Sequence, residues 1–304
     1  MQSSSTAETT PRPAKLPLLK RSLAVMKPIT WFAPMWAFTC GAIASGGTSW
    51  ALPDISRIVL GVVMAGPVLC GLSQVINDYF DREVDAVNEP QRLIPSGQIS
   101  LTQVFVTIGV LVMVGLAMAF LLGKAVLMLV GLGLIAALLY SAPPFRAKQN
   151  GWFGNALVGL SYEGLAWVAG HMVFAPITGP SLLIAALYSF GTHGIMSIND
   201  YKSIEGDRQM GIKTIPVQLG PIRAAWLIVI TMNLAQLAVF GTLLYLGLGW
   251  AALGVVGIIL VQLPIQRSFL KAPQETYLKF SAIGVSFFVW GMMVAAVGLH
   301  YLGR

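Results

Sequence analysis

Acidic side chains gather at two places in a chain that is otherwise poor in charge. Two segments open with the same tripeptide, Asn-Asp-Tyr, at positions 77–79 and 199–201. Most of the chain's 12 acidic residues lie in or just after these segments: Asp78, Asp81, Glu83, Asp85, Glu89, Asp200, Glu205 and Asp207. Clustered carboxylates repel one another and tend to take up protons. A hard cation such as Mg²⁺ prefers oxygen ligands, relieves that repulsion and commonly holds substrate phosphates. The two segments therefore predict a site for a divalent cation and a phosphorylated substrate.

The spacing of the first acidic segment is helical. Asn77, Asp81 and Asp85 recur at every fourth residue, and Asp78 precedes Asp81 by three. On a helix these positions share one face and extend over roughly 12 Å of its axis. Acids at the C-terminal end of a helix oppose the helix dipole, so a merely solvated helix end explains them poorly. We expect all four side chains to be metal ligands.

The second acidic segment is less regular. Asp200 and Asp207 keep the seven-residue spacing of Asp78 and Asp85, but Ser203 stands where the middle acid is expected. Glu205 is expected to compensate for that missing carboxylate, so Asp200, Glu205 and Asp207 complete the predicted metal site. The repeated tripeptide also hints at a duplicated helical unit, which a single match cannot establish.

Basic residues lie within or just after the acidic segments and in one further predicted loop. Each can donate to diphosphate oxygens, and arginine can do so through two parallel hydrogen bonds. For each one singly, the simpler interpretation is that it marks the cytoplasmic face of a membrane protein. The candidates for diphosphate binding are Arg92, Arg146, Lys148, Lys202 and Arg208, with Lys213 in the same loop as the last two.

Composition places these segments in a membrane protein. The chain is 56% hydrophobic and 10% charged, with a mean hydropathy of +0.75. Runs of about 20 apolar residues, each enough to cross a bilayer, predict an all-α bundle of nine transmembrane helices around a central cavity, in one domain covering 25–304. The tail 1–24 is polar and basic and is expected to be disordered or to lie on the surface. The predicted spans are 25–47, 55–77, 101–123, 124–141, 152–174, 179–199, 222–247, 249–268 and 277–300.

The basic residues also predict the orientation of the bundle. All but three of the 19 Lys and Arg residues fall in the tail or in the connections that follow even-numbered spans; the exceptions are Arg57, Lys124 and Arg304. The positive-inside rule then makes the tail and the even connections cytoplasmic and the C-terminus external. Because the acidic segments end spans two and six, both are expected on the cytoplasmic face. The net charge of +7 needs no nucleic-acid partner.

Few polar residues lie within the predicted spans. Glu163 stands in the middle of one, where an ionisable group is a functional candidate by default. His193 precedes Asp200 by seven residues and is expected on the same helix face, two turns deeper. A hydrogen-bonded interior group is a fair alternative for both residues, and for His171 it is the preferred interpretation.

These motifs resemble those of the intramembrane prenyltransferases of the UbiA superfamily. Residues 77–85 fit that family's first Asp-rich motif, Asn-Asp-x-x-Asp-x-x-x-Asp, in full. The second motif, 199–208, is similar to that of the chlorophyll and bacteriochlorophyll synthase branch. Residues 28–38, Tyr140-Ser141-Ala142-Pro143-Pro144 and His193-Gly194 look closest to its bacteriochlorophyll members. The likeness runs from about Lys27 to the C-terminus.

The resemblance implies a prenyl transfer in the inner (intracytoplasmic) membrane. Mg²⁺ held by the two clusters would bind the diphosphate of a geranylgeranyl or phytyl donor, with Asp81, Asp85 and Asp207 acting in catalysis. The 17-propionate of bacteriochlorophyllide or chlorophyllide would then attack the allylic carbon to give an ester, without the help of a strong base. Glu163, His193 and Trp31 are the residues expected to orient the macrocycle.

Two other functions stay open at this point. Prenylation of an aromatic ring carbon, as in quinone biosynthesis, requires a proton acceptor after the attack. A cation transporter is expected to hold its acids near the bilayer midplane, whereas all acids here except Glu163 fall near the edges of the predicted spans or in the loops and the tail.

Overall fold

Helices make up nearly all of the part of the chain that the computed structural model describes, residues 17–302. No strand occurs in that range; Asn150 and Lys213 form an isolated bridge. Three pairs of helices continue into one another through π turns: α3 and α4 through Met64–Cys70, α7 and α8 through Leu160–Leu165, and α14 and α15 through Phe280–Gly284. The α-helices are α1 (Leu18–Val25), α2 (Phe32–Ala44), α3 (Leu52–Val63), α4 (Gly71–Asn88), α5 (Leu101–Leu122), α6 (Lys124–Ser141), α7 (Gly151–Gly159), α8 (Ala166–Met172), α9 (Gly179–Met196), α10 (Ile204–Gln209), α11 (Ile215–Leu219), α12 (Pro221–Tyr245), α13 (Gly249–Lys271), α14 (Pro273–Lys279) and α15 (Val285–His300).

The all-α membrane class predicted from the sequence is confirmed, but the count of nine spans is not. Within residues 17–302, seven helices are long and apolar enough to cross a bilayer: Leu52–Asn88, Leu101–Leu122, Lys124–Ser141, Gly179–Lys202, Pro221–Tyr245, Gly249–Lys271 and Pro273–His300. The span expected at 25–47 contains α2, which has only 13 residues because a 3-10 turn at Pro28 precedes it and Gly46, with φ of 67°, follows it. The span expected at 152–174 corresponds to α7 and α8, whose polar Asn155, Glu163 and His171 lower its hydropathy.

The N-terminal segment is only partly described. Of the tail expected at 1–24, residues 1–16 lie outside the described range, while residues 18–25 form α1. This helix lies on the surface, with Leu19 81% exposed and Val25 buried. Arg21 Nη1 donates to Gln98 O at 2.9 Å, which fixes α1 against the loop before α5.

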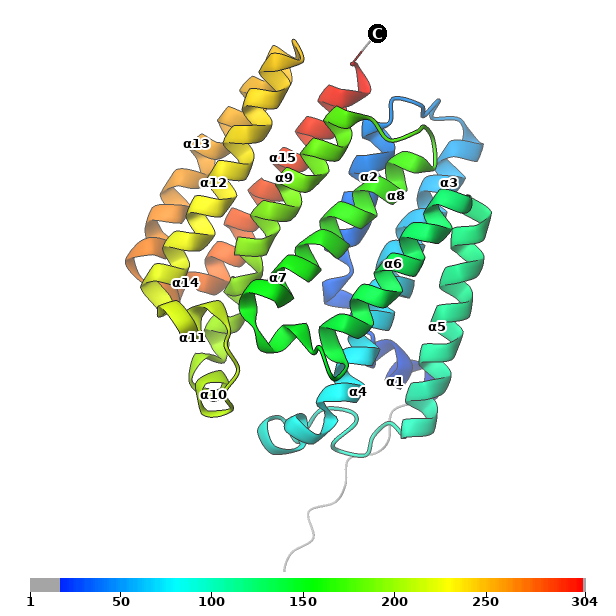
Figure 1. The fold of residues 1–304 in the computed structure, drawn as a ribbon, viewed down its shortest axis with the longest axis vertical. Helices are drawn as coiled ribbons and strands as arrows, with labels where there is room; N and C mark the ends of the chain where they lie inside the picture. The colour runs from blue at the N-terminus through cyan, green and yellow to red at the C-terminus, as the bar shows by residue number, and fades with distance from the viewer. Residues whose placement is uncertain (1–16, 303–304) are drawn as a thin grey trace, which may run out of the picture.

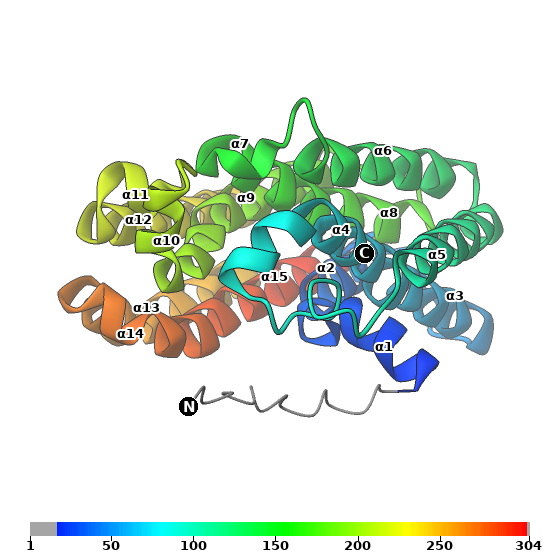
Figure 2. The same cartoon turned by 90° about the horizontal axis from the view of Figure 1, so that it is seen from below.

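The long helices lie roughly along one axis and alternate in direction, so the bundle has two ends (Figure 1). The C-terminal end of α4 and the short helix α10 lie at one end, and the C-terminus of the chain lies at the other. Figure 2, seen from the first of these ends, shows α2 and α15 inside the bundle, where they contact each other. Both acidic segments therefore lie at the same end of the molecule, as the parity of the spans predicts.

Two glycines let α2 and α8 approach until their backbones touch. A Cβ on Gly41 would lie 1.9 Å from Trp167 O, and a Cβ on Gly170 would lie 2.0 Å from Phe38 O. Neither neighbour is a side chain that can turn away. Small residues at such positions are the usual means of packing membrane helices closely, because lipid supplies no hydrophobic drive between them. This contact holds together two helices of the cavity wall.

Candidate active site

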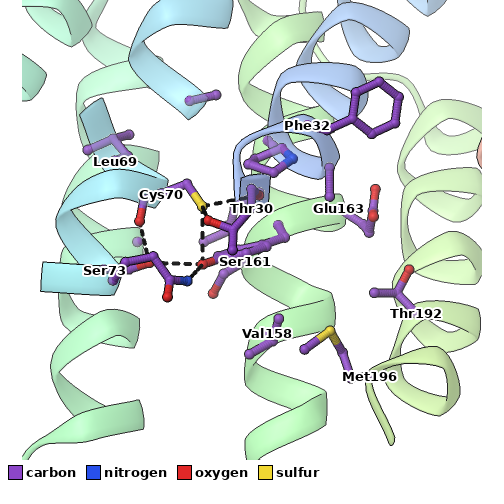
Figure 3. Close-up of a pocket in the computed structure, with 18 of the residues that line it drawn as sticks. Thr30, Phe32, Leu69, Cys70, Ser73, Val158, Ser161, Glu163, Thr192 and Met196 are labelled. Atoms are coloured by element: carbon purple, nitrogen blue, oxygen red, sulfur yellow. Dashed lines mark hydrogen bonds between the residues drawn. The ribbon is translucent and has the colours of Figure 1, made fainter. Parts of the chain in front are cut away.

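A cavity of about 890 Å³ lies inside the bundle. Its walls come from α2, α4, α6, α7–α8, α9 and α15 and are largely apolar, with side chains such as Phe38, Leu134 and Phe288. Polar residues line it where the acidic segments begin: Lys27, Asn77, Arg92, Asn199 and Lys202. The first residue of each Asn-Asp-Tyr repeat, Asn77 and Asn199, thus faces the same space. Figure 3 shows some of the residues that line this cavity.

Asp81 holds two cations from the loop after α6. Its Oδ1 lies 2.9 Å from Arg146 Nη2 and 2.6 Å from Lys148 Nζ. Lys148 also donates to Asn77 Oδ1 at 2.8 Å, so one ammonium group joins the two motif residues. Lys148 is largely buried, and this burial lowers the pKa of its ammonium group. Two of the basic residues predicted to bind diphosphate are therefore beside the first motif.

Asp78 and Asp85 are buried and paired with cations in the same way. Lys27 Nζ lies 2.6 Å from Asp78 Oδ1, and Arg92 Nη1 lies 2.8 Å from Asp85 Oδ2 and 3.7 Å from Asp78 Oδ1. Arg92 also donates through Nε to Glu89, and this hydrogen bond lowers the pKa of Glu89. Each aspartate of the first motif thus has a cation within reach, which offsets the repulsion between neighbouring acids.

The second motif divides between a 3-10 turn, Ser197–Lys202, and α10. Asn199 and Lys202 lie in the turn and line the cavity. Asp207 lies in α10, where Ser203 Oγ donates to its Oδ2 at 2.8 Å. Burial raises the pKa of the Asp207 carboxyl group. Ser203, which replaces the middle acid of the motif, therefore supports Asp207 directly.

The two motifs meet at one cavity. Asn77 of the first motif and Asn199 of the second both line it, together with Tyr140 near the end of α6. The arrangement brings together oxygen-bearing side chains from two segments more than 100 residues apart in the sequence.

Glu205 and Arg208 stand apart from this arrangement. Their side chains are 68% and 54% exposed and pair with each other at 2.6 Å. Neither lines the cavity, and both are exposed, whereas Ile204 of the same short helix is buried. The expectation that Glu205 replaces the acid missing at Ser203 finds no support in this geometry.

The donor chemistry of the site fits Mg²⁺. The amide groups of Asn77 and Asn199 line the cavity, and the motif aspartates follow them in the sequence without lining it themselves. Oxygen atoms of such side chains are the ligands this ion prefers, and Mg²⁺ is commonly held by only one or two carboxylates together with substrate phosphates. Within residues 17–302 no three acidic, histidine or cysteine side chains gather as a metal-holding group. The residues able to hold the ion are Asn77, Asp78, Asp81, Asp85, Asp200 and Asp207.

Of the three residues expected to orient a macrocycle, only Glu163 lines the cavity. It is buried in the π turn between α7 and α8. His193 instead stacks on Trp152 and its Nε2 lies 3.1 Å from Trp152 O. The helical period explains the difference, since Thr192 and Met196 of α9 face the cavity and His193 is one position removed from that face.

Trp31 does not line the cavity either. Its Nε1 donates to Met26 O at 2.9 Å, while its neighbours Thr30 and Phe32 line the space. Lys27, which the sequence analysis counts only as a marker of topology, reaches the site instead. Its position just before Pro28 gave no signal of that role, because the contact with Asp78 bridges 51 residues.

Known proteins resemble this chain over most of its length. The model of the UbiA prenyltransferase family matches residues 32–292. The bacteriochlorophyll synthase 34 kDa chain of Chloroflexus aurantiacus is 55% identical over 281 residues, which cover 92% of this chain and 90% of that protein. The chloroplastic chlorophyll synthase of Oryza sativa subsp. japonica is 39% identical, over 93% of this chain and 77% of its own length.

Solved structures share the fold. A UbiA homologue from Archaeoglobus fulgidus bound to GPP and Mg²⁺ superposes with a TM-score of 0.70 at 21% identity, covering 91% of this chain and all of that one. A digeranylgeranylglyceryl phosphate synthase gives a TM-score of 0.69 at 20% identity, covering 92% and 99% of the two chains.

Proposed function

Because the chain belongs to the UbiA prenyltransferase family, and is therefore a membrane prenyltransferase, we propose that it is a bacteriochlorophyll synthase. It joins a geranylgeranyl or phytyl group from the prenyl diphosphate to the 17-propionate of bacteriochlorophyllide. The observation that carries this assignment is the 55% identity, over nearly the whole chain, to a bacteriochlorophyll synthase. The chlorophyll synthases are 39–40% identical to this chain. Two other bacteriochlorophyll synthases are 38% and 40% identical. Chlorophyllide is therefore the second candidate acceptor.

The prenyl diphosphate is expected to place its anionic head among the cations at the motif end of the cavity. Lys27, Arg92 and Lys202 line this end, and no ion pair forms with Lys202 within the described residues. Charge-assisted hydrogen bonds from such groups to phosphate oxygens are short and strong. Arg146 and Lys148 do not line the cavity, but they are held at Asp81 and add positive charge beside the first motif.

Mg²⁺ is the proposed cofactor, with Asn77, Asp78, Asp81, Asp85, Asp200 and Asp207 as the residues that hold it. When bound, the ion stabilises negative charge on the departing diphosphate. The carboxylates and cations of the site pair with one another in this structure. When both ligands are bound, the carboxylates would pair with the metal ion and the Lys and Arg side chains with diphosphate. The negative charges of neighbouring carboxylates would then be neutralised both before and after binding.

The reaction breaks the bond between the allylic carbon and the diphosphate oxygen, and the electron pair leaves with diphosphate. A carboxylate oxygen of the acceptor supplies the pair for the new carbon–oxygen bond, so no proton has to be removed. The apolar cavity walls exclude water, which otherwise traps an allylic cation and gives the alcohol. This route suits a site in which the residues at the motif end are cations and metal-binding carboxylates. Prenylation of an aromatic carbon, in contrast, needs a base beside the reacting carbon.

We further propose that the motif end of the bundle is cytoplasmic. The end that carries α4's C-terminus and α10 (Figure 1) is the one where most Lys and Arg residues of the sequence fall, which the positive-inside rule assigns to the cytoplasm. A reporter enzyme that works only outside the cytoplasm should be active when it is fused after Arg304. Activity of a reporter that works only in the cytoplasm would show that the proposed orientation is wrong.

The decisive test is the mass of the product. Membranes containing the chain are incubated with Mg²⁺, geranylgeranyl or phytyl diphosphate, and either bacteriochlorophyllide or chlorophyllide. The expected products, in equal amounts, are the prenyl ester of bacteriochlorophyllide and free inorganic diphosphate. An Asp207→Asn variant is the inactive control. An ester formed only from chlorophyllide would assign the second candidate instead, and prenylation of neither pigment would refute both.

A further inference from the structure

A second set of polar side chains lies on the cavity wall one helical turn from Asn77, outside the proposed diphosphate site. Ser73 and Gln74 of α4 meet Tyr162, which comes from the π turn between α7 and α8. The Tyr162 hydroxyl lies 2.9 Å from Ser73 Oγ, 3.3 Å from Gln74 Nε2 and 3.4 Å from Cys70 Sγ. All of these residues line the cavity, and the dashed lines around Ser73 and Cys70 in Figure 3 mark this network.

The direction of each hydrogen bond follows from the number of protons. Ser73 Oγ donates its only proton to Cys70 O at 2.8 Å, so it accepts the proton of the Tyr162 hydroxyl. The Tyr162 oxygen then accepts from Gln74 Nε2. One N–H of the Gln74 amide is thus fixed, and within residues 17–302 no other hydrogen bond of that side chain is formed. Its second N–H and its carbonyl oxygen remain for a molecule in the cavity.

The neighbouring residue Ser161 points to the same conclusion independently. It lines the cavity, and its Oγ is buried with no hydrogen-bond partner within the described part of the chain. A buried hydroxyl without a partner is destabilising. Ser161 and Gln74 therefore both line this cavity with unused hydrogen-bonding groups that oxygen atoms of a bound molecule could satisfy.

We propose that Gln74, held in place by Tyr162 and Ser73, binds the carboxylate of the acceptor substrate. This inference rests on the proposed function. Gln74 and Ser73 precede Asn77 by three and four residues, so they lie one turn, about 5.4 Å, along the helix from the diphosphate end. An attacking oxygen stands roughly 3–3.5 Å from the carbon it approaches, and the leaving oxygen is bonded to the opposite side of that carbon. One helical turn therefore matches the separation of the attacking and leaving oxygens.

The neutral character of this wall suits a nucleophile. Arginine or lysine would bind a carboxylate more strongly through charge-assisted hydrogen bonds and would withdraw electron density from the oxygen that must attack. An amide donor fixes the position of one oxygen and leaves the other free to react. Separate places for the carboxylate and the diphosphate also keep the anionic acceptor from occupying the cationic site at Arg92 and Lys202.

Equilibrium binding of pigment tests the inference apart from turnover. The purified full-length protein, without prenyl diphosphate, is titrated with bacteriochlorophyllide and with its 17-propionate methyl ester, and binding is followed by pigment absorbance. Loss of a hydrogen bond to a charged group should weaken binding of the free acid to Gln74→Leu by roughly 10- to 100-fold. Binding of the methyl ester should change less than about threefold. The isosteric Gln74→Glu variant should lose affinity for the acid at least as strongly, because two carboxylates then oppose each other.

Gln262→Leu is the matched control. Gln262 is buried in α13, donates to Gly284 O at 3.3 Å and does not line the cavity, so both affinities should stay at the wild-type value. In turnover assays the Gln74 variants should raise KM for the pigment and leave KM for the prenyl diphosphate unchanged. Melting temperatures near that of the wild type are the check on folding, and Gln74→Glu preserves the shape of the side chain.

The two proposals fail in different ways. Equal losses for the acid and the ester would show that Gln74 contacts the ring and not the propionate. Unchanged affinities in both variants would show that it contacts neither. Either result overturns this inference while wild-type synthesis of the pigment ester continues. A wild-type protein that makes no ester and binds no pigment refutes the proposed function, and this inference falls with it.

Discussion

Replacing Asp81 by asparagine separates its two proposed roles, the neutralisation of cations and the binding of Mg²⁺. The change removes the charge that faces Arg146 at 2.9 Å and Lys148 at 2.6 Å. Removing one partner of a buried ion pair costs about 3–5 kcal/mol. The lower end of this range applies here, because the three side chains are 14–23% exposed to solvent. A loss of about 3 kcal/mol corresponds to a fall in melting temperature on the order of 5–10 °C.

Besides this loss of stability, Asp81→Asn should lower turnover by roughly 10²–10³-fold, because charge stabilisation at the leaving group is lost. The assay is ester formation at saturating Mg²⁺ and at a temperature well below the melting point of the variant. Adding Lys148→Met removes the unpaired ammonium group, so the double variant should regain most of the lost melting temperature and none of the turnover. Arg146 keeps its contact with Phe80 O in that variant. Recovery of turnover in the double variant would refute the reasoning, because Asp81 would then serve only to neutralise Lys148.

Other substitutions give further expectations. Lys27→Met should raise KM for prenyl diphosphate about tenfold in steady-state assays, since an ammonium group that lines the cavity no longer donates to phosphate; an unchanged KM would exclude it from the site. Asp207→Asn should lower turnover at least about 100-fold while Glu205→Gln changes it less than about twofold, because Glu205 is exposed and paired on the surface; similar effects of the two would restore Glu205 as a ligand. Gly170→Ala should lower the melting temperature or the yield of folded protein, as its Cβ would meet Phe38 O at 2.0 Å, and normal stability would contradict the close packing of α2 and α8. Chelation with EDTA should abolish ester formation and added Mg²⁺ should restore it, whereas full activity without a divalent cation would rule out the proposed cofactor.

The local part of the site was predictable because it obeys a helical period. Asp78, Asp81 and Asp85 lie on one face of α4, as their spacing indicates, and the parity of the apolar runs correctly brings the second motif to the same end of the bundle. Each pass through the bundle reverses the direction of the chain, so parity depends on the number of passes between the two motifs and not on how apolar each helix is. The prenyltransferase family is confirmed by a match over residues 32–292.

What the sequence did not reveal depends on the rotation of helices and on contacts between distant segments. His193 was expected on the face of Asp200, but the 3-10 turn from Ser197 changes the period between them, and Thr192 faces the cavity instead. Tyr162 meets Ser73 across 89 residues. Neither the π turn that points Tyr162 inward nor the partner it meets leaves a mark in the local pattern of apolar residues.

The three π turns have a consequence for how such an enzyme can change. Each supplies lining residues of the cavity, Cys70 from the first, Glu163 from the second and Ser281 from the third. A π turn holds one more residue than an α turn, so it absorbs that residue locally and the helix on either side stays in register. Deleting one residue there would restore a regular α-helix without rotating the ends that carry the acidic motifs, but it would remove a position from the cavity wall and redirect the lining side chains of that turn. Selection for new acceptors in this fold is therefore expected to act inside the π turns, where the wall can change while the motif ends keep their neighbours.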